Sequence, residues 1–127
     1  MISRNVTLTI NDANVSLDKK VLVCKGDKGI VLNINLKTNV YKIGEEIVKA
    51  RALIKDPSGD VKATNVSEIV EKVFALNLDD VWVDGAGEAG RYLVQIQLYG
   101  AEPANNGLTL QSFQIEVVEP IADIPLA

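Results

Sequence analysis

The sequence predicts an all-β domain built as a sandwich of two sheets with about seven to eight strands. Apolar and polar residues alternate with a period of two, which is the period of a strand. Turn sequences separate the alternating runs, and no convincing long helical pattern lies between them, so two packed sheets are favoured. With 127 residues, 47% of them hydrophobic, the chain is long enough to bury one core.

Four runs alternate most strongly, and in each of them one set of side chains should face the core while the other faces water. These runs are residues 30–37, 48–55, 91–98 and 113–118. Ile30, Leu32, Ile34 and Leu36 form the inward set of the first run. Weaker alternation predicts four more strands, at residues 4–10, 20–24, 61–65 and 72–78.

The segment 67–79 fits two structures. Its apolar residues Ile69, Val70, Val73 and Phe74 would also lie on one face of a helix with Ser67 as the N-cap. The surrounding β pattern favours a strand over residues 72–78, followed by a short helical turn around residues 78–82.

Turn residues punctuate the chain between these runs. Residues 25–29, 84–90 and 102–107 are rich in glycine or polar residues, and Asp56-Pro57-Ser58-Gly59 is a tight-turn sequence. After residue 118 the alternation stops, and Pro120 and Pro125 predict an extended segment. We therefore expect a sandwich over residues 1–118 and a C-terminal tail or linker over residues 119–127.

The composition disfavours several classes of function. The formal net charge is −4 and the basic residues are scattered, which disfavours nucleic-acid and anionic-membrane surfaces. The chain has no histidine, so Ser-His-Asp and Cys-His catalysis are excluded and a catalytic zinc site is improbable. Cys24 has no disulfide partner within the chain and fits a small strand residue. No N-terminal secretion signal and no run long enough to span a bilayer is visible. We expect a non-enzymatic protein without a cofactor.

Two motifs resemble ligand-binding sites, but each has a simpler structural explanation. Residues 85–90 match the G-x-G-x-x-G pattern of dinucleotide sites, which requires a helix to follow, whereas a strand is predicted here. Asp79, Asp80, Asp84 and Glu88 could hold calcium, but their spacing does not match an EF-hand loop. We expect a flexible loop in the first case and, in the second, a solvated acidic loop with no metal.

The residues Gly90, Arg91 and Tyr92 predict a structural corner. In immunoglobulin-type sandwiches a tyrosine near the start of the sixth strand bonds through its hydroxyl to backbone a few residues upstream, and a core residue follows two positions later. Tyr92 and Val94 fit these two places. The sandwich is therefore expected to be immunoglobulin-like.

The chain resembles the N-terminal domain of phage baseplate upper proteins over about residues 4–118. The resemblance is carried by the order and spacing of five segments, residues 6–10 (VTLTI), 25–34 (KGDKGIVLNI), 50–59 (ARALIKDPSG), 89–99 (AGRYLVQIQLY) and 111–117 (QSFQIEV). It implies an immunoglobulin-like domain that anchors tail-tip components to the tail hub. It also implies other tail or baseplate proteins as partners, assembly in the bacterial host cytoplasm, a place in the virion tail tip and, because tail parts form symmetric rings, a homo-oligomer in the particle.

Protein binding should use surfaces that are apolar and exposed. The candidate partner surface consists of four residues. Leu53 and Leu93 point outward from their strands, and Pro120 and Ile121 lie in the tail. The alternative function is carbohydrate binding or host adhesion. Sugar binders present exposed aromatic rings. Since the other aromatic residues are assigned to the core, Tyr41, Trp82 and Tyr99 remain as candidates for that role.

Overall fold

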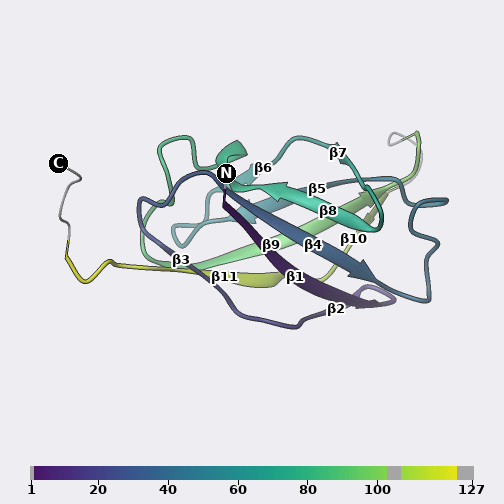
Figure 1. Ribbon diagram of the computed structural model, residues 1–127, viewed down its shortest axis with the longest axis horizontal. Coiled ribbons are helices and arrows are strands. Elements are labelled where there is room, and N and C mark those ends of the chain that lie inside the picture. Colours follow the sequence, from purple (N-terminus) through teal and green to yellow (C-terminus); the bar gives the residue numbers. More distant parts are fainter. Residues whose placement is uncertain (1, 103–106, 123–127) are drawn as a thin grey trace.

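The computed structural model describes residues 2–102 and 107–122 of the chain (Figure 1). In this part of the chain, strands account for almost all the regular structure. They are β1 (Ile2–Asn11), β2 (Asn14–Leu17), β3 (Val21–Cys24), β4 (Ile30–Lys37), β5 (Lys49–Lys55), β6 (Val61–Ala63), β7 (Ser67–Glu68), β8 (Val73–Asn77), β9 (Gly90–Tyr99), β10 (Gly107–Thr109) and β11 (Phe113–Val118), with one 3-10 turn, η1 (Leu78–Asp80).

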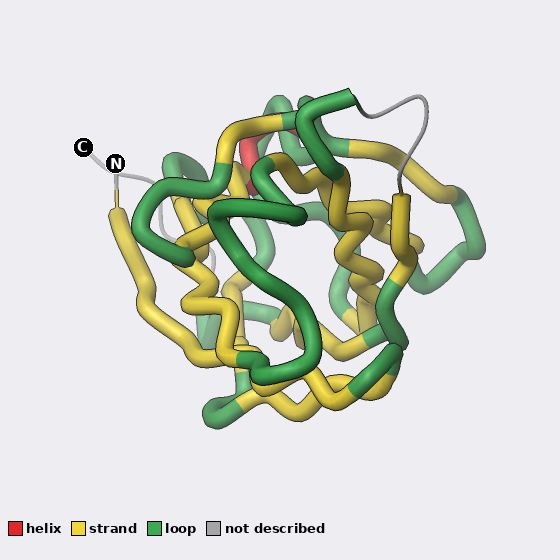
Figure 2. Tube along the Cα trace, turned by 90° about the vertical axis from the view of Figure 1, so that its right-hand side faces the viewer, coloured by secondary structure: helices red, strands yellow, loops and turns green. Residues whose placement is uncertain are grey.

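The strands form two sheets, which confirms the predicted all-β sandwich. The four-stranded sheet has the order β2-β1-β4-β8, and the larger sheet has the order β3-β11-β9-β5-β6, with β10 on β9 and β7 on β5. Most neighbours are antiparallel, but β1 pairs with β4 and β3 pairs with β11 in parallel. Seen end-on, the strands surround an interior that buried side chains fill (Figure 2).

All eight predicted runs form strands, and three further short strands, β2, β7 and β10, raise the number in the described residues to eleven. Two of the three, β7 and β10, are parts of longer strands that are interrupted. β6 and β7 both pair with β5, and Thr64 between them still donates its N–H to the carbonyl of Ala52 at 2.9 Å. β10 and β11 both pair with β9, and Leu110 between them bonds to Ile96 at 2.9 Å.

The core is built mainly from the inward-facing residues of β1, β3, β4, β5, β8, β9 and β11. Ile30, Leu32, Ile34 and Leu36 are all buried, as the period-two pattern predicts. The same holds for Ala50, Ala52 and Ile54 on β5, for Tyr92, Val94, Ile96 and Leu98 on β9, and for Phe113, Ile115 and Val117 on β11. Leu32, Ile34, Leu76, Val94, Ile96 and Ile115 are wholly inaccessible.

The segment with two predicted structures is strand rather than helix. β7 and β8 occupy most of residues 67–77, and β8 pairs with β4. The expected short turn follows as η1, where the side chain of Asn77 accepts a bond from the N–H of Asp79 at 3.1 Å. This turn directs Val81 and Trp82 into the core.

Candidate functional site

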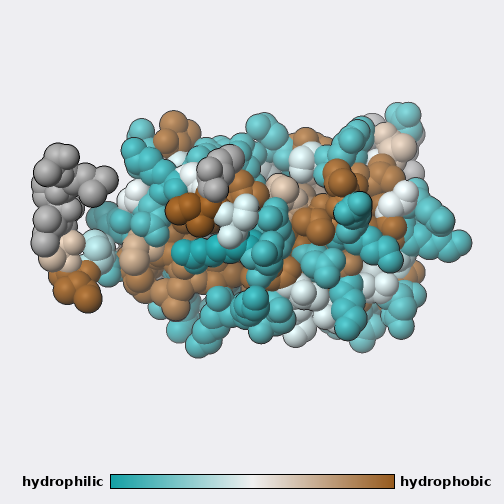
Figure 3. Space-filling model, viewed as in Figure 1, coloured by the Kyte–Doolittle hydropathy of each residue, from teal (hydrophilic) through white to brown (hydrophobic). Residues whose placement is uncertain are grey.

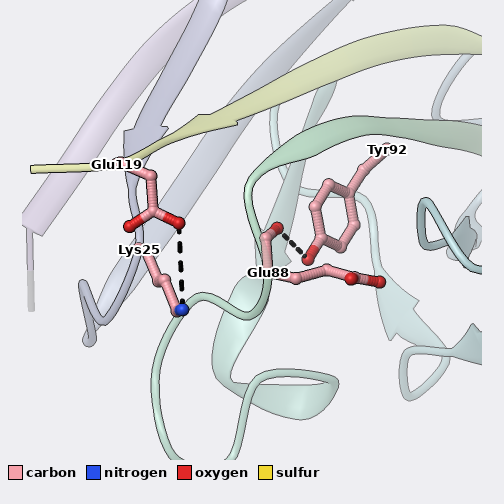
Figure 4. A network of polar contacts seen from close by, with 4 residues as sticks. All are labelled: Lys25, Glu88, Tyr92 and Glu119. Atoms are coloured by element: carbon pink, nitrogen blue, oxygen red, sulfur yellow. Dashed lines mark hydrogen bonds and ion pairs between the residues drawn. The ribbon is translucent and has the colours of Figure 1, made fainter.

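Tyr92 lies at the start of β9 with its ring buried and its hydroxyl at the end of the sandwich. The hydroxyl donates a hydrogen bond to the backbone carbonyl of Glu88, four residues upstream, at 2.8 Å (Figure 4). The ring of Trp82 meets the Tyr92 ring edge to face, with centroids 5.4 Å apart and an interplanar angle of 87°. Such pairs add stability beyond their buried area. Burial first, then the negative charges of Glu88 and Asp56, raise the pKa of Tyr92 above its ordinary value.

The other two corner residues occupy distinct places. Gly90 has a φ of +143°, and a Cβ added there would lie 2.7 Å from a carbon of the Pro57 ring. Arg91 is exposed on the outer face of the sheet, where it lies opposite Glu116 in the register of β9 and β11. Gly90 and Tyr92 therefore shape the corner, whereas Arg91 belongs to the surface.

The glycine-rich loop packs backbone to backbone against the loop between β3 and β4. Gly26 donates its N–H to the carbonyl of Ala86, and Ala86 donates to the carbonyl of Asp27, both at 2.8 Å. Gly85 has a φ of +95°, and a Cβ there would lie 2.5 Å from the carbonyl oxygen of Gly26. The last glycine of the motif opens β9, a strand. The glycines thus permit close backbone packing, and a helix N-terminus does not follow them.

Two acidic residues near this loop accept hydrogen bonds from backbone amides. A carboxylate oxygen of Asp79 accepts the N–H of Gly29 at 3.0 Å, and one of Asp80 accepts the N–H of Asn65 at 3.2 Å. Among the described residues, no three His, Cys, Asp or Glu side chains come together in a way that could hold a metal ion. Asp79 and Asp80 instead tie neighbouring loops together.

A hollow of about 290 Å³ lies beside the corner. Its walls include Asp56, Asp60, Lys62, Trp82 and Tyr92. Asp56 is held by its own turn, since its side chain accepts bonds from Ser58 and from the N–H of Asp60. The hydrogen bond from Ser58 is the main cause that lowers the pKa of Asp56.

The outer face of the larger sheet brings two of the four candidate partner residues together. Leu53 on β5 and Leu93 on β9 line one groove of about 250 Å³, which also includes Lys55, Val61 and Gln95. Leu93 is 38% exposed and Val61 57% exposed. The volume is below the roughly 300–1,000 Å³ of small-molecule sites, so the groove suits one or two side chains of a partner. We call it the Leu53–Leu93 groove.

One cation, Lys55, lines this groove, and the two strands that form it carry further basic side chains. Outward positions of β5 and β9 carry four cations and no acidic residue; the set, named here the basic face, is Lys49, Arg51, Lys55 and Arg91. On the neighbouring strands, Glu68 lies opposite Lys49 and Glu116 lies opposite Arg91, so Arg51 and Lys55 are the cations of this face without a glutamate in register. Arg51 is held in place because its Nε donates to the side-chain oxygen of Gln97 at 2.7 Å, and that oxygen also accepts the Tyr99 hydroxyl at 2.9 Å. A basic face on a chain of net charge −4 favours an acidic partner segment.

The outer face of the four-stranded sheet has a different character, which the sequence analysis missed. The non-buried alternate positions of its strands are mostly small and uncharged, namely Ser3, Asn5, Thr7, Thr9, Asn11, Asn14, Ser16, Val31, Asn33, Asn35, Lys37, Val73, Ala75 and Asn77. The face of the molecule shown in Figure 3 is largely hydrophilic, with apolar groups in separate patches. Period-two alternation could have revealed the lack of charge, because every second residue of β1 and β4 contributes to it.

Pro120 and Ile121 lie apart from the groove, beyond the end of β11. The chain there runs away from the sandwich (Figure 1), and Ile121 is fully exposed. Glu119 makes an ion pair with Lys25 at 3.8 Å (Figure 4). Both side chains are more than half exposed, so this contact contributes little stability. Residues 123–127 of the expected tail lie outside the described part of the chain.

The aromatic residues do not form an exposed platform. Trp82 was one of the three candidate surface rings of the alternative function, and for this residue the interpretation is wrong: it is 8% exposed because η1 turns it onto Tyr92. Tyr41 and Tyr99 are half-buried, and their hydroxyls bond to Asp12 and Gln97. The described residues therefore offer little for sugar stacking.

The fold is shared with a phage protein domain. The chain superimposes on the N-terminal domain of phage TP901-1 ORF48 with a TM-score of 0.62 over 92% of this chain and 98% of that chain, at 12% sequence identity. No protein-family model and no curated protein sequence matches the chain. None of the helices in the described residues has the length and hydropathy to cross a membrane. At this identity the comparison shows a common fold.

Proposed function

We propose that this protein is a non-catalytic structural component of a phage or prophage tail baseplate, where it binds other tail proteins and anchors tail-tip components during assembly. The observation that carries the proposal is the fold shared with a phage domain across nearly the whole length of both chains. The sequence resemblance to baseplate upper proteins points the same way. The chain would then act in the virion tail tip after assembly in the host cytoplasm.

The surface of the domain supports a binding role. The larger sheet exposes an apolar groove with the cation Lys55 in its lining, a combination that gives a partner both burial and charge complementarity. The four-stranded sheet offers a second, nearly uncharged face. The histidine-free composition leaves this domain without the usual general base of acyl-transfer catalysis.

The test is co-purification of the full chain with the products of neighbouring genes. We expect a tail protein to bind and the Leu93→Asp variant to bind less, because a carboxylate would then replace apolar surface in the groove. Val83→Asp is the matched control, since Val83 is 82% exposed and does not line the groove. A chain that binds none of these proteins would contradict the proposal, and so would binding to a glycan array in place of protein binding.

A further inference from the structure

We infer that the Leu53–Leu93 groove of one copy of this chain receives the C-terminal arm of a second copy, with Ile121 as the side chain that enters it. The arm is defined as residues 119–122. This inference deepens the proposed function by naming a second copy as an occupant of the basic face, and it rests on that face being a protein-binding surface.

The first reason is that the arm presents an apolar side chain with nothing against it. Ile121 has a relative exposure of 108%, higher than any other large hydrophobic residue in the described part of the chain. The arm leaves the sandwich at the end of β11, whereas Leu93 pairs across the sheet with Gln114 near the start of that strand. The chain's own groove therefore lies back along β11, opposite to the direction in which the arm departs (Figure 1).

The second reason is that the groove and the arm match in shape and chemistry. Leu53, Val61 and Leu93 surround a volume of about 250 Å³, which is suited to a branched aliphatic side chain. Pro120 precedes Ile121, and proline fixes φ and lowers the entropy lost when an extended segment docks.

The third reason is charge. Glu119 precedes Pro120 in the arm, and the cation Lys55 lines the groove on the outer face. Elsewhere two copies repel, because each carries a net charge of −4. The Lys25 contact of Glu119 is exposed and long, at 3.8 Å, so Glu119 can exchange it for a cation of the neighbouring copy. Contacts of this kind close into a symmetric pair or a ring.

The decisive experiment is disulfide trapping between two separately purified variants in a Cys24→Ser background. One chain carries Leu93→Cys and the other, with a size tag, carries Ile121→Cys. We expect the mixed disulfide dimer to form at least roughly tenfold faster than with a tagged Val83→Cys chain as the matched control. Equal rates for the two pairs would overturn the inference.

A second measurement separates exchange between copies from folding back within one chain. A single chain carrying both Leu93→Cys and Ile121→Cys should give covalent multimers as protein concentration rises. A product that stays monomeric with a closed loop would overturn the choice of a second copy as occupant.

Sedimentation of the unmodified chain gives a readout without cysteine chemistry. Ile121→Asp should weaken self-association by roughly tenfold or more, because it removes a buried aliphatic side chain. Val83→Asp should leave self-association unchanged. An unmodified chain that remains monomeric at all concentrations would overturn the inference, while tail-protein binding in the co-purification experiment would leave the proposed function standing.

Discussion

The hydroxyl of Tyr92 should contribute measurably to stability, and Tyr92→Phe tests this contribution alone. The substitution keeps the buried ring and its edge-to-face contact with Trp82, and it removes only the 2.8 Å bond to the carbonyl of Glu88. A hydrogen bond of this kind contributes about 0.5–1.5 kcal/mol net, and removing it leaves a carbonyl unpaired. We expect a loss of about 1 kcal/mol in the free energy of unfolding, or roughly 3–5 °C in Tm for a domain of this size.

The assay is urea unfolding followed by the emission of Trp82, the single tryptophan of the chain. Trp82 is buried against Tyr92, so unfolding exposes it to water and shifts its emission. The matched control is Tyr41→Phe, which removes a hydroxyl bonded to Asp12 at 3.3 Å on the surface. The control should lose less than about 0.5 kcal/mol.

The pH dependence gives an independent readout of the same hydroxyl. Burial and the nearby negative charges raise the pKa of Tyr92 above 10.0 in the folded state. Its contribution is therefore fully present below pH 10 and is lost as the pH rises through the raised pKa. Burial and Asp12 also raise the pKa of Tyr41, so Tyr92→Phe should lack only the part of the alkaline loss that comes from Tyr92, and Tyr41→Phe should retain that part. Equal stability of the Tyr92→Phe and unmodified proteins would refute the corner as a stabilising bond.

Three further outcomes follow from the loops at this end of the sandwich. Gly85→Ala should lower the free energy of unfolding by at least about 1 kcal/mol more than Gly59→Ala, measured by urea midpoints, because both positions have positive φ but only Gly85 lacks room for a Cβ; equal losses would show that the loop can move away from Gly26. Asp56 has a folded pKa below its usual 3.8, chiefly through its bond from Ser58, so its stabilisation is present above that pH and is lost as the pH falls through the folded pKa. Asp56→Asn should reduce this acid sensitivity in thermal scans from pH 5 downward, and an unchanged acid profile would contradict the assignment. Added calcium should leave the Trp82 emission and the Tm unchanged, since Asp79 and Asp80 bind backbone amides; a rise in Tm that saturates with calcium would show a site in the acidic loop.

The sequence predicted the strands well because burial here follows a strict period of two. The inward set on β4 and the set from Tyr92 to Leu98 on β9 are buried without exception. The three strands that were not predicted, β2, β7 and β10, have two to four residues each. Runs of this length hold too few alternations to stand out from a turn.

The fate of Trp82 could not be read from alternation, because it follows a 3-10 turn and not a strand. The available signal was that Val81 and Trp82 follow Leu78 by three and four residues, since residues three and four apart share a face in a helical turn. All three are buried. Periodicity in the sequence indicates which side of a regular strand or helix is buried. Trp82 follows the short 3-10 turn η1, which has no such regular pattern.

The surface was predicted only in part for a different reason. Leu53 and Leu93 were recognised as outward residues of their own strands, but that they share a groove depends on the pairing of β5 with β9. Register between strands is set by tertiary contacts that one sequence does not display. The same limit applies to the parallel pairs β1–β4 and β3–β11.

The parallel pairing of β3 with β11 has a consequence for how the protein is made. Val21 lies beside Ile115, so β3, which is synthesised early, must wait for β11, the last strand of the described residues, before its sheet can close. Until β11 leaves the ribosome, β3 and β9 each lack a neighbour, and an unpaired edge is prone to aggregate. Sheets dominated by such distant pairings fold slowly, over milliseconds to seconds. Folding of the larger sheet should therefore be completed only once residues 113–118 have left the ribosome, and deletion of these residues should yield insoluble protein.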